Sequence, residues 1–133
     1  MIDPSYEIQP EDELLRKVPT KNQNADGNDY IKILPDGRKA ITRLAFRPDP
    51  VRDINGLSTS IIQLVQSIEL LYNQQSHLGV FVTKNQCDGL GLSCVHAPES
   101  ANFEDIGFAH ALILGLMGRK DLQATLADIC III

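Results

Sequence analysis

The sequence predicts an α+β fold with a mixed or mainly antiparallel sheet and two main helices packed on one face. Short stretches rich in β-branched and aromatic residues outnumber the helical patterns and do not alternate with them regularly. Pro-Asp-Gly at 35–37 is a turn signal between two such stretches. Only 60–75 and 120–129 show broad apolar faces at helical spacing. An α+β domain accounts for all three observations.

The first thirty residues are expected to be peripheral. EDELLRKV at 11–18 is typical of a short helix, with acidic residues in its first turn and Arg16 and Lys17 near its end. Pro19 would end it, and the polar, aperiodic residues 20–29 indicate a linker. We therefore predict a peripheral helix and polar linker over residues 1–30, followed by a single α+β domain over residues 31–133.

The domain is expected to begin with a β-hairpin. Its strands are 30–34 and 40–46, and Pro48 and Pro50 end the second one because proline donates no backbone hydrogen bond. A further short strand is expected over 57–61, after an Asn-Gly turn signal.

In the second half of the chain, apolar and polar residues alternate less clearly. A helix is predicted over 60–75, a strand over 77–84, and a turn over 85–91. We then expect a return strand over 92–96, a buried strand over 108–116 and a final helix over 120–129. Strand order stays open, because the helix over 60–75 can also be a right-handed crossover between parallel strands.

Composition narrows the function classes. A net charge of −5 and a pI near 5.0 argue against a general nucleic-acid binder, and 5% aromatic residues without tryptophan argue against a base-stacking surface. The acidic N-terminus lacks a signal-peptide pattern and the apolar runs are too short to span a membrane. The 3 cysteines are an odd number without zinc-knuckle spacing, which indicates reduced thiols, and a Cys87–Cys94 bridge across a turn is the alternative. We expect a cytoplasmic protein that binds neither nucleic acid nor membrane.

An anion site is predicted in the arginine-rich stretch 43–60, RLAFRPDPVRDINGLSTS. Arg43 and Arg47 can hold a phosphate or carboxylate in bidentate fashion, while Ser58 and Ser60 would stand at the N-terminus of the helix over 60–75. The alternative is that a serine merely caps the helix and the arginines pair with nearby aspartates. No Walker-type loop is present.

His110, within the apolar run FAHALILG, is the candidate catalytic residue. It can act as a general base, or it can be a partly buried histidine hydrogen-bonded to the backbone. A metal site would require His77 and His96 to converge with it, and no HxH or HExxH spacing supports this. We therefore predict neither a metal nor a cofactor.

An arginine on an early strand followed by the Ser-Thr-Ser strand at 58–60 resembles the cofactor pocket of ADP-ribosyltransferases, which combines such residues with a later glutamate. In this chain the spacing from Arg43 to Ser58 is short, and no Glu-x-Glu pattern follows Ser60. The resemblance implies transferase chemistry on a nicotinamide nucleotide.

The C-terminal tail, Ile131 to Ile133, holds more apolar bulk than a chain end usually shows. It can complete the protein's own sheet, self-associate, or meet a protein partner by edge pairing. The main functional hypothesis is thus an accessory or regulatory protein-interaction module. The alternative is a small transferase or hydrolase acting on a nucleotide or phosphorylated substrate.

Overall fold

The structure is a computed structural model that describes residues 6–21, 29–102 and 104–133. It contains a six-stranded sheet, a separate two-stranded sheet, two α-helices and short 3₁₀ turns. The strands are β1 (Glu13–Pro19), β2 (Ile31–Ile33), β3 (Lys39–Ile41), β4 (Leu57–Ile61), β5 (His77–Thr83), β6 (Ser93–His96), β7 (His110–Leu114) and β8 (Ile131–Ile132). The helices are α1 (Lys84–Gly89) and α2 (Lys120–Ile129), and the 3₁₀ turns are η1 (Arg43–Phe46), η2 (Ile62–Leu64), η3 (Ile68–Leu70) and η4 (Ile106–Ala109).

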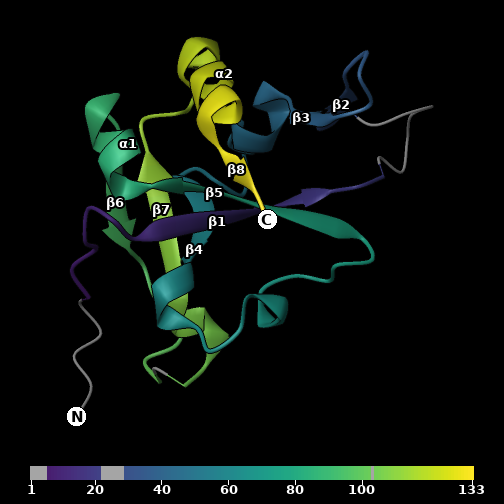
Figure 1. Ribbon diagram of the computed structural model, residues 1–133. Helices are drawn as coiled ribbons and strands as arrows, with labels where there is room; N and C mark the ends of the chain where they lie inside the picture. Colours follow the sequence, from purple (N-terminus) through teal and green to yellow (C-terminus); the bar gives the residue numbers. More distant parts are fainter. Residues whose placement is uncertain (1–5, 22–28, 103) are drawn as a thin grey trace.

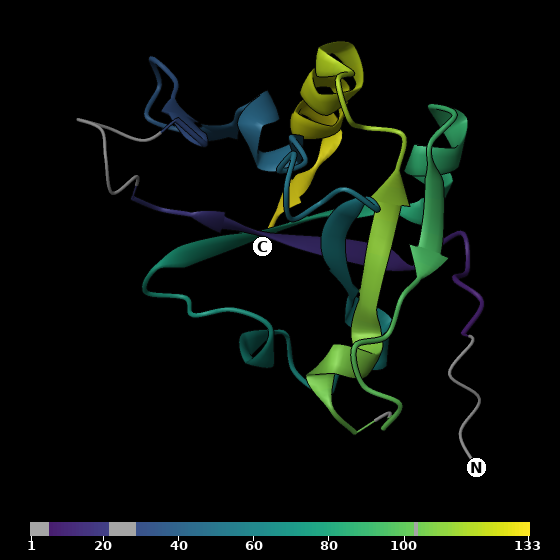
Figure 2. The same ribbon diagram turned by 180° about the vertical axis from the view of Figure 1, so that it is seen from behind.

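The large sheet has the strand order β6-β7-β4-β1-β5-β8, and each pair of neighbours is antiparallel. Helices α1 and α2 lie on one side of it together with the β2–β3 hairpin (Figures 1 and 2). The predicted α+β fold, with an antiparallel sheet and two helices on one face, is confirmed.

The hydrophobic core lies between the sheet and these helices. Alternate residues of the strands face it because strand side chains point to opposite faces in turn, as in the buried–intermediate alternation of β4. Phe46 of η1 and Leu126 of α2 are fully buried against them. The central residues of this layer are Leu14, Val18, Phe46, Leu57, Ile61, Val80, Val82, Ile113, Leu116 and Leu126.

The predicted N-terminal helix over 11–18 is wrong. These residues form most of β1, which lies between β4 and β5 in the sheet and pairs with β5 over its whole length, from Glu13↔Thr83 to Pro19↔His77. Glutamate, leucine, arginine and lysine favour a helix locally, but pairing with two distant strands overrides that preference. The predicted linker falls largely on 22–28, which lie outside the described residues.

The predicted helix over 60–75 is also wrong. Ser60 and Ile61 extend β4, where Ile61 is fully buried opposite Leu14, and the following residues form only the turns η2 and η3. Four of the apolar residues that suggested the helix are β-branched isoleucines or valines, which strands accommodate better than helices. Ile61 belongs to the core through β4 and Leu64 packs against the core from the turn η2, so neither is part of a helical stripe.

Other expectations hold with shifted boundaries. The hairpin around the 35–37 turn is present as β2–β3, but 43–46 is η1 and not the end of a strand. The expected turn over 85–91 contains α1, which begins with a capping box: Thr83 accepts from the Gln86 backbone, and the Gln86 side chain accepts from the Thr83 backbone. The strands over 57–61 and 77–84 and the helix over 120–129 are confirmed.

The C-terminal tail docks on the protein's own sheet. Ile131 and Ile132 pair with Phe81 and Val80 of β5, and the Ile133 backbone N–H donates to the Gly79 carbonyl. The tail therefore forms an edge strand, β8. None of the helices in the described part of the chain is long and apolar enough to cross a bilayer.

Candidate anion-binding cleft

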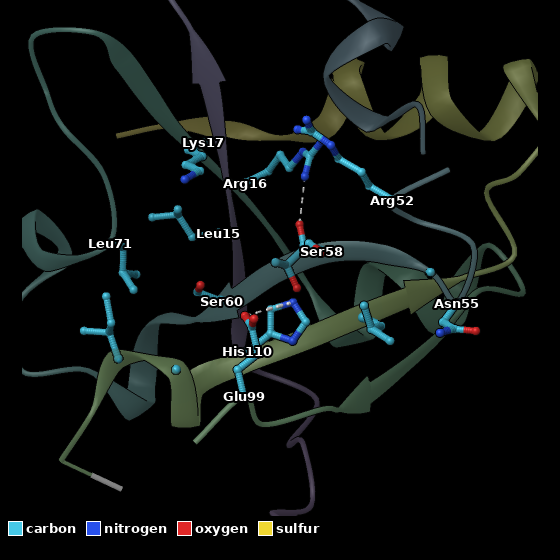
Figure 3. A pocket seen from close by; sticks show the side chains of 15 residues that line it. Leu15, Arg16, Lys17, Arg52, Asn55, Ser58, Ser60, Leu71, Glu99 and His110 are labelled. Atoms are coloured by element: carbon cyan, nitrogen blue, oxygen red, sulfur yellow. Dashed lines mark hydrogen bonds and ion pairs between the residues drawn. The ribbon is translucent and has the colours of Figure 1, made fainter. Parts of the chain in front are cut away.

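A cleft of about 510 Å³ lies on the sheet face opposite the two helices. It spans the central strands β1, β4 and β7, and Figure 3 shows its lining side chains. Lys17 and Arg16 come from β1, Ser58 and Ser60 from β4, and His110 from β7. Because β4 lies between the other two strands, the serines form a floor between a basic end and a histidine end.

Arg16 forms the inner wall of the basic end. Strands β1 and β4 pair only at Leu14↔Ile61 and Leu15↔Ser60, and the Arg16 side chain lies where they separate. Its Nε donates to the Ala45 carbonyl at 3.0 Å and its Nη1 to the Ser58 carbonyl at 3.0 Å. Two backbone carbonyls thus fix the guanidinium at the point where the backbone pairing of β1 with β4 has ended.

The positive charge of Arg16 has no carboxylate within ion-pair distance among the described residues. Burial lowers the pKa of Arg16, while the more distant Asp53 and Tyr30 raise it. A guanidinium remains protonated under all ordinary conditions. The cleft wall therefore carries a partly buried cation that two backbone carbonyls hold and that has no ion-pair partner among the described residues.

Arg52 reaches the same end from the loop between η1 and β4. Asp49 shapes this loop, since its Oδ1 accepts from the Val51 and Arg52 backbone N–H groups at 2.8 and 2.9 Å. These two hydrogen bonds hold the pKa of Asp49 below its usual value. Asp53 closes the loop by accepting from the Asp49 backbone N–H. The Arg52 side chain is thereby placed beside Arg16, as Figure 3 shows.

The side chains of Arg52 and Lys17 are exposed, and in the described residues neither makes an ion pair. Three cationic side chains therefore line the cleft, against a single carboxylate from Glu99. An excess of cations around a hollow attracts anions, and guanidinium groups bind phosphate and carboxylate in bidentate fashion.

His110 and Glu99 form the opposite end. His110 Nδ1 lies 2.7 Å from the Ala97 carbonyl, which can only accept, so this nitrogen carries the proton. His110 Nε2 then faces the Glu99 carboxylate at 3.6 Å. The imidazole side chain is 18% exposed and the glutamate 70%. A neutral His110 thus presents the lone pair of Nε2 to the cleft, which is the arrangement a general base requires.

The loop between β6 and β7 brings Glu99 to this position. The pairing of β6 with β7 continues past His96↔Ala111 through a hydrogen bond from the Ala97 backbone N–H to the His110 carbonyl. The Glu99 backbone N–H then donates to the Gly107 carbonyl. These backbone hydrogen bonds extend the β6–β7 pairing into the loop and so place the Glu99 carboxylate next to His110.

Ser58 and Ser60 are placed on the cleft side of β4, as expected from alternation with the buried Leu57, Thr59 and Ile61. Ser60 is the register partner of His110 on β7. Their predicted setting is wrong, because no helix begins at Ser60 and no helix N-terminus contributes to the site. The serines supply hydroxyls to the floor of the cleft, and not helix caps.

The two predicted arginines do not line this cleft. Arg43 Nη1 donates to Gln123 Oε1 of α2 at 3.3 Å, on the helix side of the sheet. Arg47 is exposed and lines a second cleft of about 480 Å³, which adjoins the first because Arg16 and Arg52 line both. The cleft thus contains the predicted Ser58, Ser60 and His110 but neither Arg43 nor Arg47, and the roles assigned to these residues stay predictions.

The three histidines do not converge. His96 accepts from the Tyr6 backbone N–H and lies against the Phe108 carbonyl, and His77 lies beside Ser76. The described residues contain no group of three histidine, cysteine or carboxylate side chains able to hold a metal ion.

Sequence reasoning did not assign Arg16, Lys17 or Glu99 to the site, and it included Arg52 only as one residue of the arginine-rich stretch 43–60. The two β1 residues were hidden because 11–18 looks helical, and only pairing with distant strands brings them to the cleft, Lys17 on its face and Arg16 at its edge. Glu99 has no local signal, since a loop register places it. The Asp-x-x-Arg spacing at 49–52 was available as a turn pattern that could have singled out Arg52.

Comparisons with protein-family models, with curated proteins and with solved structures find no match to this chain.

Proposed function

We propose that this protein binds a small phosphorylated molecule in the cleft over β1, β4 and β7. The observation that carries the proposal is the partly buried guanidinium of Arg16, whose hydrogen bonds within the described residues go to the backbone carbonyls of Ala45 and Ser58. Arg52 and Lys17 stand beside it without ion-pair partners in the described residues. A phosphate supplies both the charge and the several acceptor oxygens that such a group of donors requires.

The ligand is an elongated small molecule and not a bare ion. The cleft volume of about 510 Å³ is in the range of small-molecule sites and far exceeds the space that phosphate occupies. Apolar side chains contribute as well, namely Leu15, Leu71, Ile106 and Leu112. The phosphate would lie at the arginine end, and the rest of the molecule would extend along Ser58 and Ser60 toward His110.

We further propose that the protein is the transferase or hydrolase suggested by the sequence, with His110 as its general base. His110 Nε2 is the group that can take a proton from the bound molecule, because Nδ1 is already committed to the Ala97 carbonyl. The 3 free cysteines support a reducing compartment, in agreement with the cytoplasmic location expected from the sequence.

A thermal-shift screen tests the binding proposal. The full chain is measured with inorganic phosphate, phosphate monoesters and nucleotides, each beside its unphosphorylated counterpart. A ligand at a hundred times its Kd stabilises a protein by about 2.7 kcal/mol, which moves Tm by several degrees in a domain of this size. We expect shifts only with phosphorylated members, and loss of the shift in Arg52→Gln.

The matched control is Arg119→Gln, since Arg119 is an exposed arginine paired with Asp121 at the start of α2, away from the cleft. It should leave every shift unchanged. Shifts that are equal for phosphorylated and unphosphorylated compounds, or that survive in Arg52→Gln, would contradict the proposal.

The interaction-module hypothesis is a second candidate, favoured by the exposed isoleucines of the tail. Ile131 of the edge strand β8 and Ile133 just after it are 55% and 48% exposed, although apolar side chains on a sheet edge promote pairing with another chain. If β8 mediates self-association, sedimentation velocity should show a dimer whose fraction rises with concentration, and Ile132→Lys should abolish it. A monomer at every concentration would rule out self-association.

A further inference from the structure

The histidine end of the cleft presents two hydrogen-bond acceptors side by side. With Nδ1 donating to the Ala97 carbonyl, a neutral His110 has only a lone pair on Nε2. The Glu99 carboxylate, an acceptor when ionised, lies 3.6 Å from that nitrogen. In this state no proton lies between them, and either a proton on Nε2 or a donor from a ligand would join the two groups.

Apart from a proton on His110 Nε2 itself, the described residues supply no donor to this pair. The Glu99 carboxylate has His110 as its one side-chain neighbour within ion-pair distance. Ser60, the register partner of His110, makes no side-chain hydrogen bond to either group. A donor carried by the ligand would therefore satisfy both acceptors at once.

The charges at the two ends of the cleft are opposite. Arg16, Lys17 and Arg52 stand at one end, and the single carboxylate of the cleft, Glu99, stands at the other with Ser58 and Ser60 between (Figure 3). A molecule complementary to this arrangement carries its negative charge at one end and a positively charged donor at the other.

We propose that the cleft is specific for an aminoalkyl phosphate, whose ammonium group lies between the Glu99 carboxylate and His110 Nε2. An ammonium fits better than a hydroxyl because it offers several donors and a positive charge, whereas a hydroxyl offers one donor and no charge. This inference rests on the proposed function and adds a second point of recognition to it.

Isothermal titration calorimetry on the full chain tests the inference with three matched ligands. These are an aminoalkyl, a hydroxyalkyl and a plain alkyl phosphate of the same carbon number, compared over several chain lengths. We expect the aminoalkyl phosphate to bind about three- to tenfold more tightly than the alkyl phosphate, because Glu99 is largely exposed and solvent weakens its ion pair. The hydroxyalkyl phosphate should fall between them.

Two variants separate this inference from the proposed function. Glu99→Gln keeps the shape of the side chain and removes its charge, so it should bring the aminoalkyl and alkyl phosphates to nearly equal affinity. Arg52→Gln should weaken all three ligands in parallel. Glu11→Gln, which changes an exposed carboxylate before β1 and outside the cleft, should change none of them. Circular dichroism confirms that each variant is folded.

Each outcome is decisive. Equal binding of the three ligands to the unmodified protein would overturn the inference while leaving the proposed function intact. Binding of none of them would remove the proposed function itself. Preference for the hydroxyalkyl phosphate, lost in Glu99→Gln, would show that the donor is a hydroxyl and that the assignment of an amine is wrong.

Discussion

The two faces of the large sheet are built from the same strands but differ in chemistry. On the helix side, Leu57 and Ile61 of β4 pack into a closed apolar core beneath Phe46. On the other side, Ser58 and Ser60 of the same strand line an open cleft with arginines at its edge. Because strand side chains alternate, five consecutive residues of β4 serve both faces.

This difference suggests that the helix side of the sheet contributes most of the stability and the cleft side the binding. Substitutions on the helix side should lower the free energy of unfolding, because they leave cavities in a packed interior. Substitutions at the exposed edge of the cleft should change binding and leave stability nearly as it was. Arg16 belongs to both faces, since it lies on the core side of β1 and yet lines the cleft.

The largest loss of stability is expected from Phe46→Ala. Phe46 is fully buried between η1 and the sheet, and its truncation should cost about 3–5 kcal/mol of unfolding free energy. Urea unfolding followed by circular dichroism measures this loss. Val51→Ala, an exposed apolar residue in the loop before β4, should cost less than about 0.5 kcal/mol. Similar losses in the two variants would mean that the helix side does not carry the stability.

Arg16→Met should combine both kinds of effect. Methionine fills much of the volume but leaves the Ala45 and Ser58 carbonyls without their donor, at a cost of about 1–3 kcal/mol. The same variant should also lose the binding of phosphorylated ligands. Parallel urea unfolding and thermal-shift measurements test the two losses. A variant of full stability would show that the two carbonyls find other donors, and would remove Arg16 from its structural role.

Gly79→Ala should disturb the packing that borders the cleft face. A Cβ at this position of β5 would lie 2.7 Å from the Tyr72 hydroxyl and 2.8 Å from two ring carbons, so the ring must move. The expected cost is about 1–2 kcal/mol, measured by urea unfolding. Gly89→Ala at the end of α1 is the matched control, because nothing lies within 4 Å of its added Cβ. An unchanged stability in Gly79→Ala would show that the tyrosine moves away freely.

The elements that sequence predicted best are those whose signals are local. The helix over 120–129 has an apolar face within ten residues, and the β2–β3 hairpin has its turn residues in place. The stretches 11–18 and 60–75 were wrong for one reason. The partners of 13–19 and of Ser60 and Ile61 are strand residues some fifty to seventy positions away, and this long-range pairing overrode local helix preference. The rest of 60–75 forms only short turns.

The candidate site followed the same rule. Ser58 and Ser60 were predicted as residues at the N-terminus of a helix, and they line the cleft for another reason, since they alternate with buried residues on β4. His110 lies on the strand expected for it, β7. The basic residues were assigned to Arg43 and Arg47 by nearness in sequence, whereas the cleft takes Arg16 and Lys17 from a strand that looked helical. Only the register of β1 against β4 places those side chains beside the serines.

Arg52→Gln should have the smallest effect on stability and a clear effect on binding. The Arg52 side chain is exposed and unpaired in the described residues, and the Asp49 hydrogen bond uses its backbone N–H, which glutamine retains. The unfolding free energy should therefore stay within about 0.5 kcal/mol. Loss of a charged hydrogen bond to phosphate should lower affinity about tenfold or more, measured by calorimetry. Arg47→Gln, in the adjoining cleft, should lower it less. If Arg47→Gln lowered the affinity more than Arg52→Gln does, the phosphate would lie in the second cleft. Arg16, which lines both clefts, would then contribute to binding there and not on the serine face of the sheet.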